Sequence, residues 1–176
     1  MFRMDNYLER WAEAYKPINH IPSAGSKERR FYRMDSITAI APFMANLVNA
    51  KSPSMAYITQ IDATLAGQSE KFVIVTHRVF FLVKQAGINL QNGVTEELAA
   101  TDAKVDGYEM AQDLLAYLYH DYRQNKNKDL EGIDFKGASI FTTPQQFNGW
   151  WPTEVVFTQM QPRILCVNRE KYKNLP

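Results

Sequence analysis

The sequence predicts an α+β domain in which about five strands form a mostly antiparallel sheet, with an N-terminal helix and one long helix packed on it. Two observations predict this class. Strand-like runs come in two blocks, before and after a single long helical stretch, rather than in strict alternation with helices. In addition, the 176 residues are 45% hydrophobic, 12% aromatic and 22% charged, which is the size and composition of one soluble domain spanning residues 1–176.

The first helix is predicted within residues 5–17, "DNYLERWAEAYKP", because apolar side chains recur there at helical spacing. Asp5 or Asn6 is the expected N-cap, and Pro17 should end the helix. Residues 18–30, "INHIPSAGSKERR", combine proline, glycine and serine with a burst of charge. This composition predicts an exposed loop.

The middle of the chain predicts a broken helix and then a β-hairpin. Helical spacing over residues 35–53 is interrupted by Pro42, which disfavours the helical conformation of the residue before it. Residues 54–85, "SMAYITQIDATLAGQSEKFVIVTHRVFFLVKQ", contain two strand-like runs around a turn-prone segment. The second run is apolar on both faces, so we expect cover on both. In the first run one face is apolar: Met55, Tyr57, Ile61 and Leu65.

The long helix is predicted over residues 105–126, "VDGYEMAQDLLAYLYHDYRQNK", with Asp106 as its N-cap and residues 88–107 as the linker that precedes it. Its expected apolar stripe is Tyr108, Ala111, Leu115, Leu118, Tyr119 and Tyr122. Alternating patterns then predict three closing strands, at residues 139–143, 153–161 and 163–169.

Charge and targeting features exclude several classes of function. Lys plus Arg number 20 against 19 for Asp plus Glu, so no strong overall field draws the chain to nucleic acid or to an anionic membrane. No run approaches the length of a membrane span or of a signal-peptide core, and we expect a cytoplasmic protein. The one cysteine, Cys166, lies in a strand-like run without a neighbouring His or cationic cluster, which predicts an inert thiol.

No motif in the chain indicates a reaction. The three histidines, His20, His77 and His120, fall on different predicted elements without metal-ligand spacing. Phosphate-binding loops and nucleophile elbows are also missing from the sequence. We therefore expect no enzyme activity, no catalytic residue, no cofactor and no metal. His77 and Arg78 point to opposite faces of their strand, so each should meet a polar neighbour on its own side.

Two kinds of binding surface stay open. Trp150 and Trp151 are adjacent on a strand and face opposite ways, so we expect either an exposed interface anchor or core packing with a lid over the sheet edge. Arg29 and Arg30 are candidates to touch an acidic partner. The alternative is a small-molecule-binding or enzymatic cone with an apolar pocket in which Asp62 or His77 is the polar residue. Its lining would comprise Tyr57, Phe72, Phe80, Trp150 and Tyr117.

A nucleic-acid adaptor is a third reading. Lys27, Arg29, Arg30 and Arg33 alternate with the aromatic residues Phe31 and Tyr32, as stacking surfaces for single strands require. The neutral overall charge argues against this reading.

The layout as a whole resembles the tail-terminator and head-tail completion proteins of tailed bacteriophages. The matching parts are an opening helix "YLERWAEAY", the hairpin of residues 55–85, the helix "GYEMAQDLLAYLYHDYRQ" and the closing strands in "WPTEVVFTQMQPRILCVN". The resemblance implies a non-catalytic structural subunit of a phage or prophage virion that forms a homo-oligomeric ring. Its partners would be other virion or tail proteins, in the host cytoplasm or in the virion.

Overall fold

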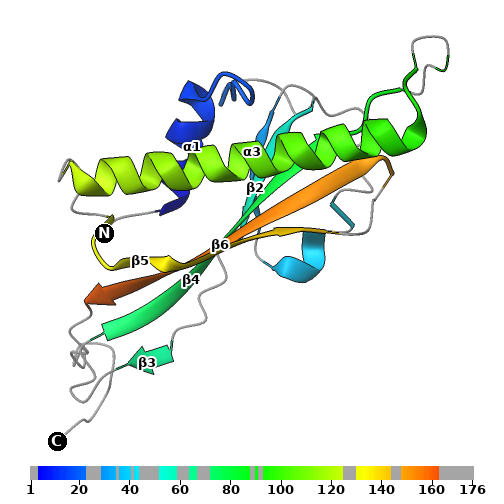
Figure 1. Cartoon of the computed structure of the whole chain (residues 1–176). Helices are drawn as coiled ribbons and strands as arrows, with labels where there is room; N and C mark the ends of the chain where they lie inside the picture. The colour runs from blue at the N-terminus through cyan, green and yellow to red at the C-terminus, as the bar shows by residue number, and fades with distance from the viewer. Residues whose placement is uncertain are drawn as a thin grey trace, which may run out of the picture.

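In the part of the chain that the structure describes, six strands, two α-helices and a 3-10 turn form an α+β arrangement (Figure 1). The computed structural model describes residues 4–22, 29–34, 36–40, 42–43, 52–58, 64–66, 72–87, 90, 93–124, 130–143 and 148–162. The helices are α1 (Met4–Ala14) and α3 (Glu96–Arg123). The strands are β1 (Phe31–Met34), β2 (Ser54–Ile58), β3 (Thr64–Ala66), β4 (Phe72–Lys84), β5 (Ile133–Thr142) and β6 (Trp150–Pro162).

The sheet is mostly antiparallel, as predicted. Its strand order is β1-β2-β4-β6-β5, and β3 pairs with the far end of β4. Only the edge pair β1 and β2 is parallel among the described pairs. Strands β4 and β6 pair over their whole lengths, from Phe72 opposite Pro162 to Lys84 opposite Trp150. Both β2 and β3 pair antiparallel with β4, which confirms the predicted hairpin.

The two faces of the sheet carry separate cores. On one face, α1 and α3 cover a large cluster that includes Leu8, Phe81 and Val155. The other face is covered near β1 and β2, where the half-buried side chains Tyr32, Ala39, Ile40 and Phe43 pack on a smaller cluster. Part of that cover is the 3-10 turn η1 (Ile37–Ala39) in the segment predicted as a broken helix, of which residues 35, 41 and 44–51 are not described. The expectation that β4 needs cover on both faces is confirmed for its second half. The smaller cluster comprises Met34, Ala56, Ile58, Phe80, Leu82 and Trp150.

Helix α3 begins nine residues before the predicted range of residues 105–126. Its N-cap is Thr95, whose side chain accepts a hydrogen bond from the Leu98 backbone N–H at 3.2 Å, and Glu96 and Glu97 follow in the first turn. Asp106 is therefore an interior helical residue and not a cap. Gly107, a poor helix former, is tolerated because a Cβ there would lie 2.6 Å from Thr153 Oγ1 on β6, so the helix approaches the sheet closely at this point.

The buried stripe of α3 also differs from the prediction. Four of its seven members are alanine or glycine, and at Gly107 the helix lies close to the sheet. Tyr108, Tyr119 and Tyr122, predicted to face the core, are instead exposed by 43%, 46% and 38%. The buried positions are Ala99, Ala103, Gly107, Met110, Ala111, Leu114 and Leu118.

Three other boundaries differ. Strand β1 lies in a segment predicted as the end of a loop, and β5 begins six residues before its predicted start because a bulge between Asp134 and Ser139 breaks the alternating pattern. Asp5 is not the N-cap of α1 but a buried residue of its first turn. The predicted strand at residues 163–169, with Cys166, lies outside the described residues.

Candidate functional site

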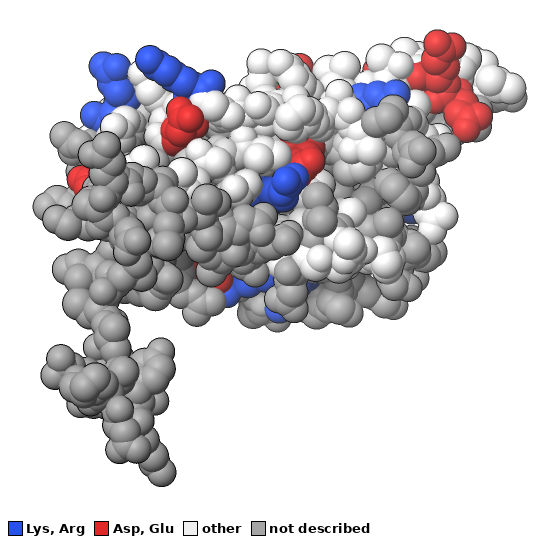
Figure 2. Space-filling model, turned by 90° about the horizontal axis from the view of Figure 1, so that it is seen from below, with Lys and Arg blue, Asp and Glu red and all other residues white. Residues whose placement is uncertain are grey.

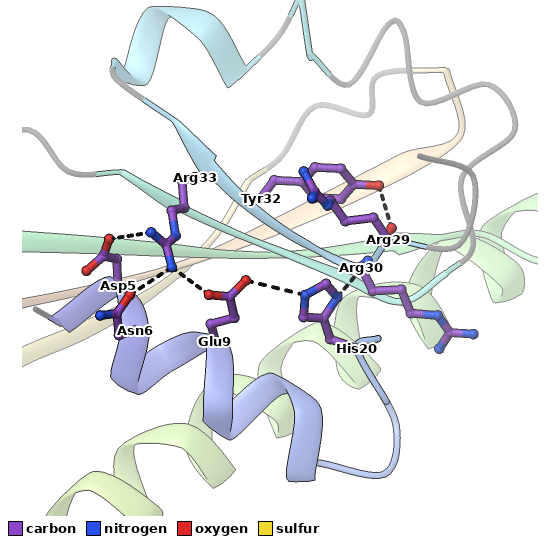
Figure 3. A network of polar contacts seen from close by, with 8 residues as sticks. All are labelled: Asp5, Asn6, Glu9, His20, Arg29, Arg30, Tyr32 and Arg33. Carbon is purple, nitrogen blue, oxygen red and sulfur yellow. Dashed lines mark hydrogen bonds and ion pairs between the residues drawn. The ribbon is translucent and has the colours of Figure 1, made fainter. Parts of the chain in front are cut away.

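A polar network joins helix α1 to the edge strand β1 (Figure 3). Arg33 on β1 lies 2.9 Å from Asp5 through Nη1, and its Nη2 donates to Glu9 Oε2 at 2.5 Å. The same Nη2 donates to Asn6 Oδ1 at 2.9 Å. Asp5 is buried and the Arg33 side chain is 38% exposed, and these contacts fix α1 on β1 and neutralise the arginine.

His20 extends the network from the turn after α1. Its Nδ1 accepts a hydrogen bond from the Arg30 backbone N–H at 3.3 Å, so in the neutral ring the proton sits on Nε2. That Nε2 lies 3.6 Å from Glu9 Oε1, beyond hydrogen-bond distance. Burial lowers the pKa of His20, and the nearby Glu9 carboxylate offsets only part of this effect. The neutral form of His20 is therefore the one that the fold favours.

The two arginines proposed as interface residues differ in their surroundings. The Arg30 guanidinium donates through Nη1 to the carbonyls of Ile18 at 2.8 Å and Pro17 at 3.2 Å, so its side chain ties down the turn after α1. Arg29 is exposed, and its carbonyl accepts a hydrogen bond from the Tyr32 hydroxyl at 2.5 Å. Only Arg29 thus offers a free cationic side chain at the described end of this loop.

The stacking surface required by a nucleic-acid adaptor does not form among the described residues of this segment. Phe31 is 2% exposed in the core under α1, and Arg33 is held by the carboxylates of α1. Lys27 lies outside the described residues. The aromatic and cationic residues that alternate in the sequence therefore point to different environments.

His77 lies in the core between β2, β6 and the helices, at the centre of a hydrogen-bond chain. Gln159 donates through Nε2 to the Glu131 carbonyl at 3.0 Å, which leaves its Oε1 to accept from His77 Nε2 at 3.3 Å. His77 Nδ1 then accepts from the Tyr57 hydroxyl at 2.8 Å. The ring also packs on Phe157, with 5.0 Å between centroids. Both ring nitrogens are thus satisfied within the fold.

Burial favours the neutral forms of the titratable groups in the hydrogen-bond chain around His77. Burial lowers the pKa of His77 to about 4, and the hydrogen bond to Gln159 opposes the shift. Burial also raises the pKa of Tyr57, with a further contribution from the charge of Asp5. His77 therefore meets a polar neighbour on its own side of the strand, as predicted. On the opposite face Arg78 meets Glu154, with 2.6 Å between Nη1 and Oε1, which confirms the other half of that prediction.

The pocket expected for a ligand-binding cone is not assembled from the predicted residues. Tyr57 and His77 are 5% and 2% exposed, and Asp62 lies outside the described residues. Phe80 belongs to the core on the other face of the sheet, and Tyr117 is 48% exposed on α3. The side chain of Phe72 lies outside the description, and the other side chains of the predicted lining do not share one cavity.

The adjacent tryptophans face opposite sides of the sheet, as predicted, but neither is exposed. Trp150 is 1% exposed in the smaller core, and Trp151 is 8% exposed beneath α3. The Lys104 ammonium covers the Trp151 ring at 4.1 Å from its centroid, and the indole N–H donates to Gln85 Oε1 at 3.0 Å. The expected tryptophan anchor is thus wrong, because each face of β6 is covered at this end.

An open cleft of about 460 Å³ lies between the end of α1, the end of β4 and α3. Three carboxylates of α3, from Asp106, Glu109 and Asp113, line it, with Lys84 as the basic residue of the lining. The Tyr15 hydroxyl donates to Asp113 at 2.6 Å, and burial and this carboxylate raise the tyrosine pKa. Its lining contains neither Tyr57 nor His77.

Large apolar side chains are exposed at two places that the sequence reasoning did not identify. One is the flank of α3 that faces away from α1, where Leu98, Val105 and Tyr108 are 46%, 48% and 43% exposed. The other is the sheet face opposite the helices, where Phe141 is 53% and Met160 is 44% exposed. In Figure 2, neutral atoms make up most of the described surface seen from below.

The described residues show no group of three or more His, Cys, Asp or Glu side chains arranged to hold a metal ion. In the same part of the chain no helix is both long and apolar enough to cross a membrane. Comparison with models of known protein families gave no match, and comparison with curated protein sequences gave none either. The geometry of the chain itself is therefore the basis for a functional proposal.

Proposed function

We propose that the chain is a structural virion-assembly subunit of a phage or prophage, of the tail-terminator or head-tail completion type, which acts by self-association and not by catalysis. The arrangement on which the resemblance was based is present in the described residues. An opening helix, a hairpin with a long second strand, one long helix on the sheet and a closing pair of strands follow in that order.

The observation that carries the proposal is the exposed apolar surface. Helix α3 buries one stripe on the sheet and leaves a second set of large apolar residues on its outer flank. Exposed apolar patches of this kind mark association surfaces, and tyrosine is among the residues enriched in them. A subunit that completes its burial by assembly accounts for both surfaces, on α3 and around Phe141.

The alternative, a small-molecule-binding or enzymatic domain with an apolar pocket, has less support. The polar residue expected in that pocket, His77, has both ring nitrogens occupied by Tyr57 and Gln159. The open cleft beside α3 mixes three carboxylates with apolar residues such as Val83 and Met110, and it is not lined by the residues predicted for the pocket. Thermal stabilisation by small apolar ligands, lost in a His77→Gln variant, would reverse this preference.

Light scattering coupled to size-exclusion chromatography tests the proposal, over a wide range of protein concentration and at two ionic strengths. The proposal predicts a mass above that of one chain that rises with concentration, and closed rings or discrete oligomers in electron micrographs. Addition to purified phage tails that lack their terminal proteins should then produce particles with the subunit at the tail end. A monodisperse monomer at every concentration would refute it.

A further inference from the structure

One set of side chains on the outer flank of α3 follows a heptad spacing. From Leu98 to Tyr122 the spacing alternates between three and four residues through eight positions. Leu115 is half-buried, and the other seven are exposed. We call this set the outer stripe: Leu98, Thr101, Val105, Tyr108, Gln112, Leu115, Tyr119 and Tyr122. It shares no residue with the fully buried stripe, and of its eight members Leu115 also packs on the larger core.

This spacing has a specific physical meaning. A repeat of 3.5 residues keeps side chains on one seam of a helix and suits packing against a second helix. Helix α3 has 28 residues, which gives four heptads. At about 1.5 Å per residue the seam is about 40 Å long, sufficient for a continuous helix pair. A helix that only has to cover the sheet does not need this 3.5-residue repeat on its outer flank.

The neighbouring edge strand β5 is poorly suited to recruit a partner by strand pairing. The bulge between Asp134 and Ser139 interrupts its ladder with β6. Within the bulge, Asp134 Oδ1 accepts hydrogen bonds from the backbone N–H groups of Lys136 at 3.0 Å and Gly137 at 3.1 Å. A bulge of this kind, with backbone N–H groups bonded within the same strand, protects a sheet edge from pairing with another strand. The outer stripe, which continues onto β5 through contacts of Tyr119 and Tyr122 with Phe135, is thus the better association surface.

We infer that the outer stripe packs against the outer stripe of a second copy of this chain, with the two α3 helices antiparallel. The charges at the helix ends favour this occupant and this direction. Glu96 and Glu97 lie in the first turn, and His120 and Arg123 lie in the last. Figure 2 shows acidic side chains at the end of the molecule where α3 begins, and lysines or arginines with an acidic neighbour at the opposite end. Antiparallel pairing brings opposite charges together, whereas parallel pairing would place the glutamates side by side.

The antiparallel pair has a definite register when the eight positions are matched end to end. Thr101 then faces Tyr119 of the partner subunit, and Glu97 lies beside Arg123 of the partner subunit. Near the two-fold axis, Tyr108 faces Gln112 of the partner subunit, so that a phenol and an amide meet twice. A polar residue such as Gln112 near the centre of a mainly apolar seam is a known way to fix register and direction. The interface is isologous, as a two-fold pair requires.

This inference rests on the proposed function only in requiring self-association, and a cross-linking experiment separates the two. In a Cys166→Ser background, Thr101→Cys and Tyr119→Cys are prepared as separate variants and oxidised alone and mixed. The two positions are 18 residues apart on α3, about 27 Å along the helix axis. A parallel, in-register pair of helices would therefore keep position 101 of one subunit far beyond disulfide reach of position 119 of the other. Asp106→Cys, on the flank that faces the cleft beside α1, is the control that should stay uncross-linked.

The inference predicts disulfide dimers only in the mixture of the two variants. Dimers of each variant alone would show a parallel pair and overturn the antiparallel arrangement. Oligomers by light scattering without any disulfide at these positions would overturn the outer stripe as the interface and leave the proposed function intact. A chain that stays monomeric under all conditions would overturn both. Circular dichroism and thermal melting of each variant establish that it is folded.

A charge exchange provides a second test that does not depend on oxidation. Arg123→Glu should weaken the dimer about tenfold, because two symmetry-related pairs change from attraction to repulsion. Glu97→Arg in the same chain should restore the affinity. Within one subunit Arg123 contacts Tyr119, which the second substitution does not replace, so restoration reports the contact between subunits. No recovery in the double variant would contradict the register.

Discussion

Acid should destabilise this protein through one buried histidine. His77 is 2% exposed, and burial lowers its pKa from 6.5 to about 4. The unfolded chain therefore binds a proton at a higher pH than the folded chain does. The stability that depends on neutral His77 is complete above pH 6.5 and falls as the pH drops from about 6.5 to about 4.

The size of the effect follows from the two pKa values. Linkage gives a loss of about 2 kcal/mol in the free energy of unfolding by pH 5, and about 3 kcal/mol once the pH is below both values. His77→Gln removes the titrating ring but keeps a side chain that can both accept and donate hydrogen bonds. The variant should be less stable than the wild type at neutral pH by about 1–2 kcal/mol, because the packing on Phe157 is lost.

Urea unfolding, followed by circular dichroism at pH 7.5 and pH 5, measures this difference. Between the two conditions, His77→Gln should lose about 2 kcal/mol less stability than the wild type does. His20, whose pKa burial also lowers, contributes equally to both proteins and cancels in the comparison. His120→Gln, at an exposed position of α3, serves as the matched control and should behave as the wild type. An equal loss in His77→Gln and the wild type would refute the reasoning.

Two further predictions concern how the helices contact the sheet. Gly107→Ala should lower the free energy of unfolding by about 1–3 kcal/mol, although alanine favours helix, because the new Cβ meets Thr153. In a Thr153→Ala background the same substitution should lower it much less. An equal loss of stability in both backgrounds would contradict the close approach of α3 to β6. Arg33→Ala should lower the free energy of unfolding by about 1–2 kcal/mol because it removes the cation beside the buried Asp5. Arg33→Lys keeps a positive charge and should retain part of that stability. Thermal melts in which Arg33→Ala equals the wild type would show that the network contributes nothing to stability.

The fold class was predictable because its signals are local. The strand-like runs in residues 54–58 and 72–84 and the helical spacing around Trp11 each come from one short stretch of sequence. Strand β1 carried no such signal, since it has only four residues and its parallel pairing with β2 depends on contacts distant in sequence. The start of α3 did have a local signal that was overlooked. Thr95 followed by two glutamates is a typical helix beginning.

The outer stripe could not be recognised from apolar spacing alone. Helix α3 carries two apolar faces, and the one that is buried uses mainly alanine and glycine because β6 approaches closely at Thr153. The predicted stripe therefore mixed members of both faces, such as Ala111 from the buried one and Tyr108 from the exposed one. The tryptophan anchor failed for a related reason. A strand covered on both sides hides both side chains of an adjacent pair, here Trp150 and Trp151.

Self-association through α3 is the central claim, and light scattering on matched variants tests it most directly. Tyr108→Glu places a charge in the middle of the outer stripe, while Tyr117→Glu makes the same change at a position of equal exposure on the flank near α1, where Tyr117 lies beside Tyr7. We predict that the wild type and Tyr117→Glu form oligomers with rising concentration and that Tyr108→Glu stays monomeric while folded. A wild-type chain that remains a monomer at every concentration, or a Tyr108→Glu variant that associates as the wild type does, would contradict the account.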